Sequence, residues 1–324
     1  MLLSLFGLVI LSAVTGAAYN VFLKKSPEKL LFSFWVATFT SLTMTLAFYK
    51  KHYAQGISFT EITTRISALA ADNCLNFLLV TTVITLGMAL KAYLFNNYPL
   101  AKIIPLLEIG TPLTAFIYFL LGDSLRFNQI LGIGLISLGA FISGFRQFYF
   151  PNILKPLFHL PFYLYIGAFG MAFLETAENL IVYLTTEANV TTQQFVSVIH
   201  EYGLEKFTHT FVTPLEYFQV GSWFFIPIFF LYVLLITKKS CFQILQQLTL
   251  QKKNIFYASM INFVSQYLYY FAYQGDDQAV VVALTKFSVP LTLAMGYFML
   301  KEEIHTPELV AVGLIVSGGI IGAF

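Results

Sequence analysis

The chain is 324 residues long and carries a formal net charge of +2. Hydrophobic residues make up 58% of it and charged residues 10%, and its mean hydropathy is +0.76. A water-soluble globular protein of this size needs more polar side chains to cover its surface, so the composition excludes that class and predicts a membrane protein. The small net charge gives no reason to expect a nucleic-acid partner.

Ten apolar segments separated by polar connectors are predicted to be transmembrane helices. In the first half they cover Leu2–Leu23, Leu30–Tyr49, Cys74–Phe95, Leu100–Leu121 and Phe127–Phe145. In the second half they cover Pro161–Leu184, Phe218–Thr237, Ile255–Tyr273, Ala279–Leu300 and Pro307–Phe324. No basic region precedes the first segment, so we interpret it as a retained helix and not as a secretory signal. The expected fold is all-α and polytopic.

The second half of the chain repeats the plan of the first. A shift of 178 positions aligns Pro112-Leu113-Thr114 with Pro290-Leu291-Thr292, and a shift of 179 aligns Gly139 with Gly318. Five helices per half is an odd number, so the halves must insert with opposite orientations. We predict two inverted five-helix repeats, residues 1–146 and 147–324, the second with an inserted interfacial segment at 185–217.

The same alignment places Glu108 opposite Lys286, inside two apolar helices. Each such charge costs on the order of 3 kcal/mol at mid-span unless it is paired or hydrated. At a rise of about 1.5 Å per residue, Glu108 and Lys286 bracket the midplane, and Glu175 lies near the depth of Lys286. Glu178 follows one turn later.

These depths predict one polar cavity with a particular set of partners. We expect Lys286 to face Glu175 or Glu178, and Glu108 to have Lys91 or Lys102 as its nearest base. Ion pairs that fix helix register, or lysines that extend to the membrane surface, are the alternative interpretation. This alternative is favoured for Lys102, whereas for Lys91 both interpretations remain possible.

Other polar and special residues sharpen this picture. Gln266 and Tyr270 lie on one stripe of a helix and could hydrogen-bond a ligand, although tyrosines also anchor helices at the membrane interface. Pro112 and Pro290 interrupt the backbone hydrogen bonds mid-helix and predict a kink or a hinge. Spaced small residues, such as Gly139 and Gly318, predict close helix packing in the scaffold or in a homodimer.

The proline-bearing helix, the acidic turn at Asp123 or Glu302, and the glycine-patterned helix GIGLISLG or AVGLIVSG together resemble the drug/metabolite transporter superfamily, in its ten-helix EamA-like branch. This resemblance implies transport of metabolites or drugs, with both termini in the cytoplasm. The basic residues, eleven on one face and five on the other, favour the opposite orientation. The first helix lacks the acidic residue used by small multidrug members, so cationic drug export by that route is not expected.

The sequence thus predicts a secondary transporter, in a bacterial inner membrane, for a small polar or zwitterionic metabolite such as an amino acid or a nucleoside derivative. We expect no enzymatic activity, cofactor or metal, because the five histidines lie in connectors and no nucleotide-binding or catalytic motif occurs. A lipid flippase subunit and a membrane scaffold are the alternatives. The predicted substrate-binding residues are Lys286, Glu108, Glu175, Glu178, Lys91, Gln266 and Tyr270.

Overall fold

The computed structural model describes residues 2–72, 74–113, 116, 126–143, 166–174, 214–273 and 285–323. All regular structure within these residues is helical, which confirms the all-α prediction. The helices are α1 (Leu2–Lys25), α2 (Lys29–Ala54), α3 (Phe59–Asp72), α4 (Cys74–Asn97), α5 (Leu100–Leu107), α7 (Phe127–Ser143), α10 (Pro214–Thr237), α11 (Cys241–Tyr273), α13 (Ser288–Met295), the π-helix η3 (Gly296–Leu300) and α14 (Thr306–Ala323). Residues 166–174 form a further helical stretch.

Several of these helices have the length and apolar composition of membrane spans. In the described part of the chain, three candidates are Gly7–Lys25, Lys29–Ala54 and Phe77–Asn97. A fourth is the pair Phe224–Thr237 and Cys241–Tyr269, whose axes differ by 102°. Large apolar side chains such as Leu46 (71% exposed) and Leu235 (75% exposed) lie on the outside, which suits contact with lipid. These features fit a multi-pass membrane protein.

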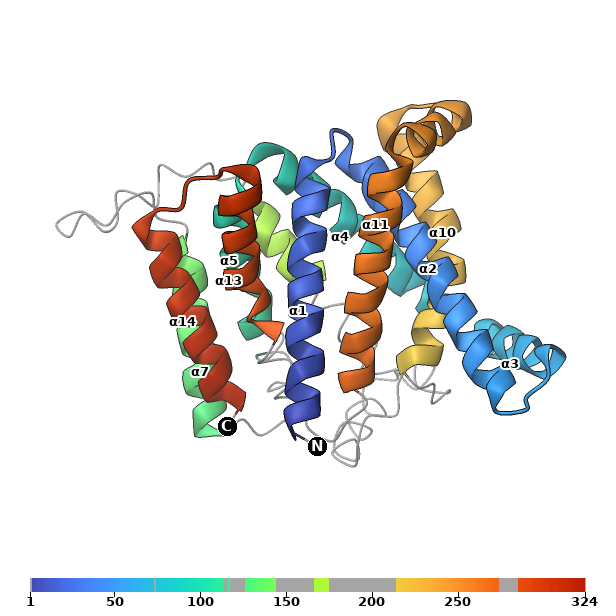
Figure 1. The fold of residues 1–324 in the computed structure, drawn as a ribbon, viewed down its shortest axis with the longest axis horizontal. Coiled ribbons are helices and arrows are strands. Elements are labelled where there is room, and N and C mark those ends of the chain that lie inside the picture. The colour runs from blue at the N-terminus through green and yellow to red at the C-terminus, as the bar shows by residue number, and fades with distance from the viewer. Residues whose placement is uncertain are drawn as a thin grey trace.

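The long helices stand side by side in one bundle (Figure 1). α1 packs against α11 and α13, α2 packs against α11 and α10, and α4 packs against α10. At one side of the bundle α7 and α14 form the most extensive helix pair in the described residues. α5 and α13 both touch this pair and also touch each other. The start of α1 and the end of α14 lie at the same end of the bundle (Figure 1).

Buried apolar clusters hold the described helices together, and two of them are extensive. The larger one joins both halves of the chain, through fully buried side chains such as Leu23, Leu100, Val289 and Ile315. The second joins α2, α10 and α11 around Phe34, Phe229 and Ile244. In lipid, helix association depends on such close packing, because exposed apolar side chains gain nothing by leaving the hydrocarbon.

Small residues bring α7 and α14 into backbone contact. A Cβ atom added to Gly132 would lie 2.5 Å from the carbonyl oxygen of Gly318, and one added to Gly318 would lie 2.5 Å from that of Gly132. A Cβ atom on Gly139 would lie 2.7 Å from the carbonyl oxygen of Ala311. These distances confirm that Gly139 and Gly318 serve close helix packing within the chain.

The contacts of this pair follow the sequence alignment. Under the shift of 179, Gly132 matches Ala311 and Gly139 matches Gly318. Gly132 meets Gly318 while Gly139 meets Ala311, so each residue touches the aligned counterpart of the other. The contacts between α7 and α14 are therefore reciprocal with respect to the alignment.

Aligned helix starts also carry the same caps. The backbone N–H of Arg126 donates to Gln129 Oε1 at 2.9 Å, and the N–H of His305 donates to Glu308 Oε2 at 3.0 Å. The aligned positions 126 and 305, like 129 and 308, differ by 179. In each cap the third helical residue reaches back to a free N–H, which is half of a capping box.

A second pair of caps is more complete. Ser58 N donates to Glu61 Oε2 at 3.0 Å while Glu61 N donates to Ser58 Oγ at 3.3 Å. At the start of α11, Ser240 N donates to Gln243 Oε1 at 2.9 Å and Gln243 N donates to Ser240 Oγ at 3.3 Å. Both helices follow the second predicted span of their half, and both begin with a full capping box.

Candidate functional site

The two proline-bearing helices, predicted over Leu100–Leu121 and Ala279–Leu300 with a kink or hinge at their prolines, are broken at aligned positions. α5 ends at Leu107, and a turn at Glu108-Ile109 separates it from the next helical residues, 110–113. A turn at Lys286-Phe287 directly precedes α13. Each charged residue is therefore the first residue of a helix break.

Proline chemistry explains where the breaks fall. Pro112 and Pro290 lie four residues after Glu108 and Lys286, where a helical residue would donate its N–H to their carbonyl oxygens. Proline has no N–H and its ring collides with that carbonyl. The carbonyl oxygens of Glu108 and Lys286 accept instead from the residue three positions on, at 3.1 Å in both helices.

The breaks bring the two charges together. Lys286 Nζ donates to Glu108 Oε2 at 2.6 Å. The two side chains are only 12% and 15% exposed, respectively. Thr111 Oγ1 donates to the same carboxylate oxygen at 3.4 Å. A charge-assisted hydrogen bond between two such shielded groups compensates for their loss of hydration, which would be costly for either group alone.

The basic partner that we predicted for Glu108 from its depth in the membrane was wrong. Its nearest base is Lys286, and not Lys91 or Lys102. Depth along a helix axis says nothing about which helix is the lateral neighbour, and here α5 and α13 are in direct contact. Glu175 and Glu178, the acids expected beside Lys286, lie outside the described residues.

A cavity of about 450 Å³ opens beside Glu108. Both halves of the chain line it: α1, α2, α4 and α5 contribute to its wall, as do the stretch 166–174, α10, α11 and α13. Its volume falls in the range of small-molecule sites, which are mostly apolar with a few polar groups that fix orientation.

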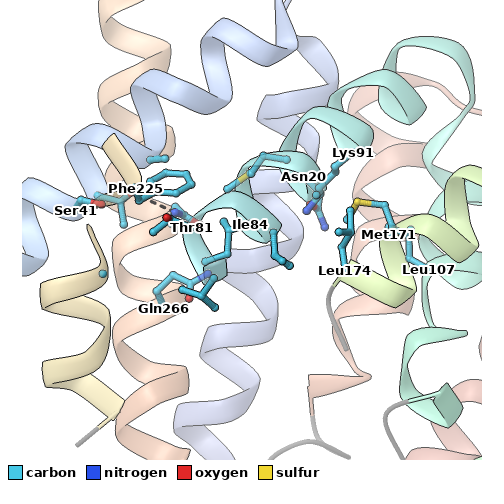
Figure 2. Close-up of a pocket in the computed structure, with 18 of the residues that line it drawn as sticks. Asn20, Ser41, Thr81, Ile84, Lys91, Leu107, Met171, Leu174, Phe225 and Gln266 are labelled. Atoms are coloured by element: carbon cyan, nitrogen blue, oxygen red, sulfur yellow. Dashed lines mark hydrogen bonds between the residues drawn. The ribbon is translucent and has the colours of Figure 1, made fainter. Parts of the chain in front are cut away.

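Three of the predicted substrate-binding residues lie at this cavity. Glu108, Lys91 and Gln266 all line it. In Figure 2, Gln266 enters from α11 and Lys91 from α4, while Met171 and Leu174 close another part of the wall. The Lys91 ammonium also lies 5.5 Å from the ring centroid of Tyr19. Tyr270 belongs to α11, but its side chain is outside the described part.

Polar groups that the sequence analysis did not single out complete the lining. Asn20 and Asn262 carry amides into the cavity. Asn262 Nδ2 donates to Thr40 Oγ1 at 3.2 Å, which ties α11 to α2. Asn20 Oδ1 is buried without a hydrogen-bond partner in the described part of the chain. Hydroxyl groups are supplied by Thr40, Ser41, Thr81, Thr111 and Ser288.

The two amide residues of the cavity could have been predicted from the sequence. Asn20 and Asn262 interrupt apolar runs, and an amide in a membrane helix needs a partner as a charge does. The hydroxyl groups gave no such signal, because serine and threonine can satisfy themselves within a helix. Thr81 Oγ1, for example, donates to the carbonyl oxygen of Phe77 at 2.6 Å.

The site therefore offers hydrogen-bond donors and acceptors, one acid held by a lysine, and a second lysine, in a chamber between the two halves. Among the described residues, no group of three or more His, Cys, Asp or Glu side chains is placed to hold a metal ion. The arrangement suits binding and orienting a small polar molecule.

No model of a known protein family matches this chain. No curated protein is significantly similar to it.

Proposed function

We propose that this chain is a secondary transporter that moves a small polar or zwitterionic metabolite across a membrane by alternating access. The observation that carries the proposal is the pair of helices broken at aligned positions beside one cavity. Broken helices near the midplane, where unwound backbone lines a cavity, are typical of secondary transporters.

Two inverted repeats related by a two-fold axis are part of the proposal. The reciprocal contacts of Gly132 and Gly139 with Gly318 and Ala311 support them, as do the duplicated helix caps. Glu108 and Lys286 support them further, because residues at aligned positions touch only where a two-fold axis passes between them. On this basis we retain the drug/metabolite transporter superfamily, in its EamA-like branch, as the proposed family.

The chemistry of the cavity favours a polar substrate of modest size. Its amides and hydroxyls can both donate and accept, and Lys91 offers a cation to a carboxylate or phosphate. An amino acid or a nucleoside-derived metabolite meets these conditions. A pure scaffold would gain stability by filling the space, so a cavity of about 450 Å³ argues for a ligand.

The test is uptake by proteoliposomes that contain the purified full-length chain and a panel of labelled amino acids and nucleosides. We expect saturable uptake of one class, and we expect Gln266→Leu to raise KM for it about tenfold or more through the lost hydrogen bonds. Gly134→Ala is the matched control, because a Cβ atom at Gly134 meets nothing within 4 Å. Absence of uptake across the panel by well-folded protein would count against transport of these solutes.

A further inference from the structure

The Glu108 carboxylate lies where a membrane helix is interrupted, and the ends of interrupted helices bind coupling ions in secondary transporters. It lies at the end of α5, beside the cavity, and is 15% exposed. An acidic side chain at such a break in a membrane helix must be neutralised by something. A proton, a metal cation or a basic side chain can each do this, and only the first two can be transported.

In this chain the neutralising group is part of the chain. Lys286 Nζ lies 2.6 Å from Glu108 Oε2, and Lys286 is itself only 12% exposed. Its backbone is fixed by the turn before α13, where its carbonyl oxygen accepts from Val289 N at 3.1 Å. An ammonium is a compact charge with three donors, so it fills a cation site and satisfies the carboxylate at once.

We infer that the Lys286 ammonium is the permanent counter-cation of Glu108, tethered where a coupling proton or alkali cation would otherwise bind. Its consequence for transport rests on the proposed function: Glu108 then carries no ion across the membrane, and substrate moves without cation coupling at this carboxylate. Occupation of the site by Lys286 does not depend on that function and can be measured without a substrate.

Other titratable groups lie near the pair of Glu108 and Lys286, and their response to pH has to be distinguished from that of the pair. Lys91 on α4 lines the same cavity, with Tyr19 of α1 beside its ammonium. Lys102 on α5 and Glu308 on α14 lie together at a second pocket, around the start of α5. α7 contributes no acidic or basic side chain. Glu175 and Glu178 are outside the described residues, so the experiment has to assign the response to Glu108 by mutation.

The experiment measures thermal unfolding of the purified full-length chain in detergent, from pH 5 to pH 9, in choline, lithium, sodium or potassium buffer. We expect the Tm of the wild type to be the same in all four salts. In Lys286→Met the freed carboxylate should lower Tm by about 6–12 °C at pH 8. Acid, or a small alkali cation, should restore Tm, because either one replaces the lost charge.

Two further variants assign the effect. Glu108→Gln combined with Lys286→Met removes both charges and should abolish the dependence on pH and cation. Lys102→Met is the matched control and should leave wild-type behaviour unchanged. If Lys286→Met does not fold, the exchanged pair Glu108→Lys with Lys286→Glu keeps the interaction and should remain insensitive to alkali cations.

A wild-type Tm that rises with sodium or lithium, and loses this rise in Glu108→Gln, would overturn the inference. So would a Lys286→Met variant that is as stable as the wild type at pH 8 in choline. In proteoliposomes the expected uptake is the same with and without a proton or sodium gradient. A complete lack of uptake would count against the proposed function alone, because the unfolding experiment needs no substrate.

Discussion

On one side of α5 and α13 the helices α7 and α14 touch backbone to backbone, and on the other side the helices enclose a cavity of about 450 Å³. Figure 1 shows the α7–α14 seam at one edge of the bundle, with α5 and α13 next to it. In the seam, glycines of one helix lie against backbone atoms and isoleucine or leucine side chains of the other, so the helices cannot separate without losing contacts. The cavity wall is mostly apolar but also carries amides, hydroxyls and charges, which need hydrogen-bond or ionic partners. Close backbone packing therefore distinguishes the first region, and polar groups beside a cavity distinguish the second.

This contrast assigns different consequences to mutation in the two regions. Replacing the small residues of the seam by larger ones should lower the stability of the fold, whichever molecule is transported. Replacing polar residues of the cavity wall by apolar ones should leave folding nearly intact and should weaken substrate binding. The ion pair of Glu108 and Lys286 lies between the two regions and should affect both.

The largest effect is expected where a buried charge loses its partner. Lys286→Ala leaves the Glu108 carboxylate alone and should lower the free energy of unfolding by about 3–5 kcal/mol. The ion pair of Lys239 with Glu28, with side chains 30% and 32% exposed, is the comparison. Lys239→Ala should cost about 1 kcal/mol or less, since solvent screens that pair. Unfolding in SDS measures both, and equal losses would contradict the special position of Lys286.

The second-largest effect is expected for mutations in the seam between α7 and α14. Gly318→Leu forces side-chain atoms toward the Gly132 carbonyl and should cost about 2–3 kcal/mol, with loss of membrane abundance. Gly313→Leu is the control, because a Cβ atom at this exposed glycine of α14 meets nothing within 4 Å. Fluorescence-detected gel filtration and SDS unfolding report the difference. If the two variants behave alike, α7 and α14 are not in backbone contact.

A smaller effect should separate binding from folding in the cavity. Asn20 Oδ1 is buried and has no partner among the described residues, so Asn20→Leu removes an unsatisfied group. We expect unchanged or slightly higher Tm, together with about tenfold weaker substrate binding, since the amide is then absent from the site. Melting curves and uptake KM test both halves of this statement. A clear loss of Tm would show that the amide serves the fold.

The smallest effect concerns the pH dependence of a helix end outside both regions. The backbone N–H and the hydroxyl of Ser58 donate hydrogen bonds that lower the pKa of the Glu61 carboxyl below its ordinary value of 4.5. A lowered pKa means that the cap contributes above pH 4.5 and is lost as pH falls through the folded-state value. The start of α3 should therefore fray in acid.

The start of α11 supplies a matched control, because Gln243 occupies the same place in its capping box and cannot titrate. Amide exchange, expressed as protection factors, should show acid-induced loss at 59–62 and none at 241–244. Glu61→Gln should remove the difference. Equal acid sensitivity at both helix starts would rule out the carboxylate as its cause.

Periodicity and composition were enough to predict an all-helical chain, and two prolines were enough to predict interrupted helices. The alignment of Glu108 with Lys286 also pointed to their pairing, because under the proposed two-fold symmetry aligned residues that lie on the axis meet each other. Assigning partners from helix depth missed this, since depth carries no information about lateral neighbours. The cavity hydroxyls could not be predicted, because threonines in a helix that bond their own backbone look the same in sequence whether or not they face a cavity.

The pairing of Glu108 with Lys286 across 178 residues has a consequence for how such a chain could arise. In an assembly of two identical halves, the same geometry would press two carboxylates or two ammoniums against each other, and like charges repel strongly in a dry interior. Once both halves belong to one polypeptide, each copy can change on its own, and one position can become acidic while its counterpart becomes basic. Under the proposed duplication, gene fusion made this attraction available.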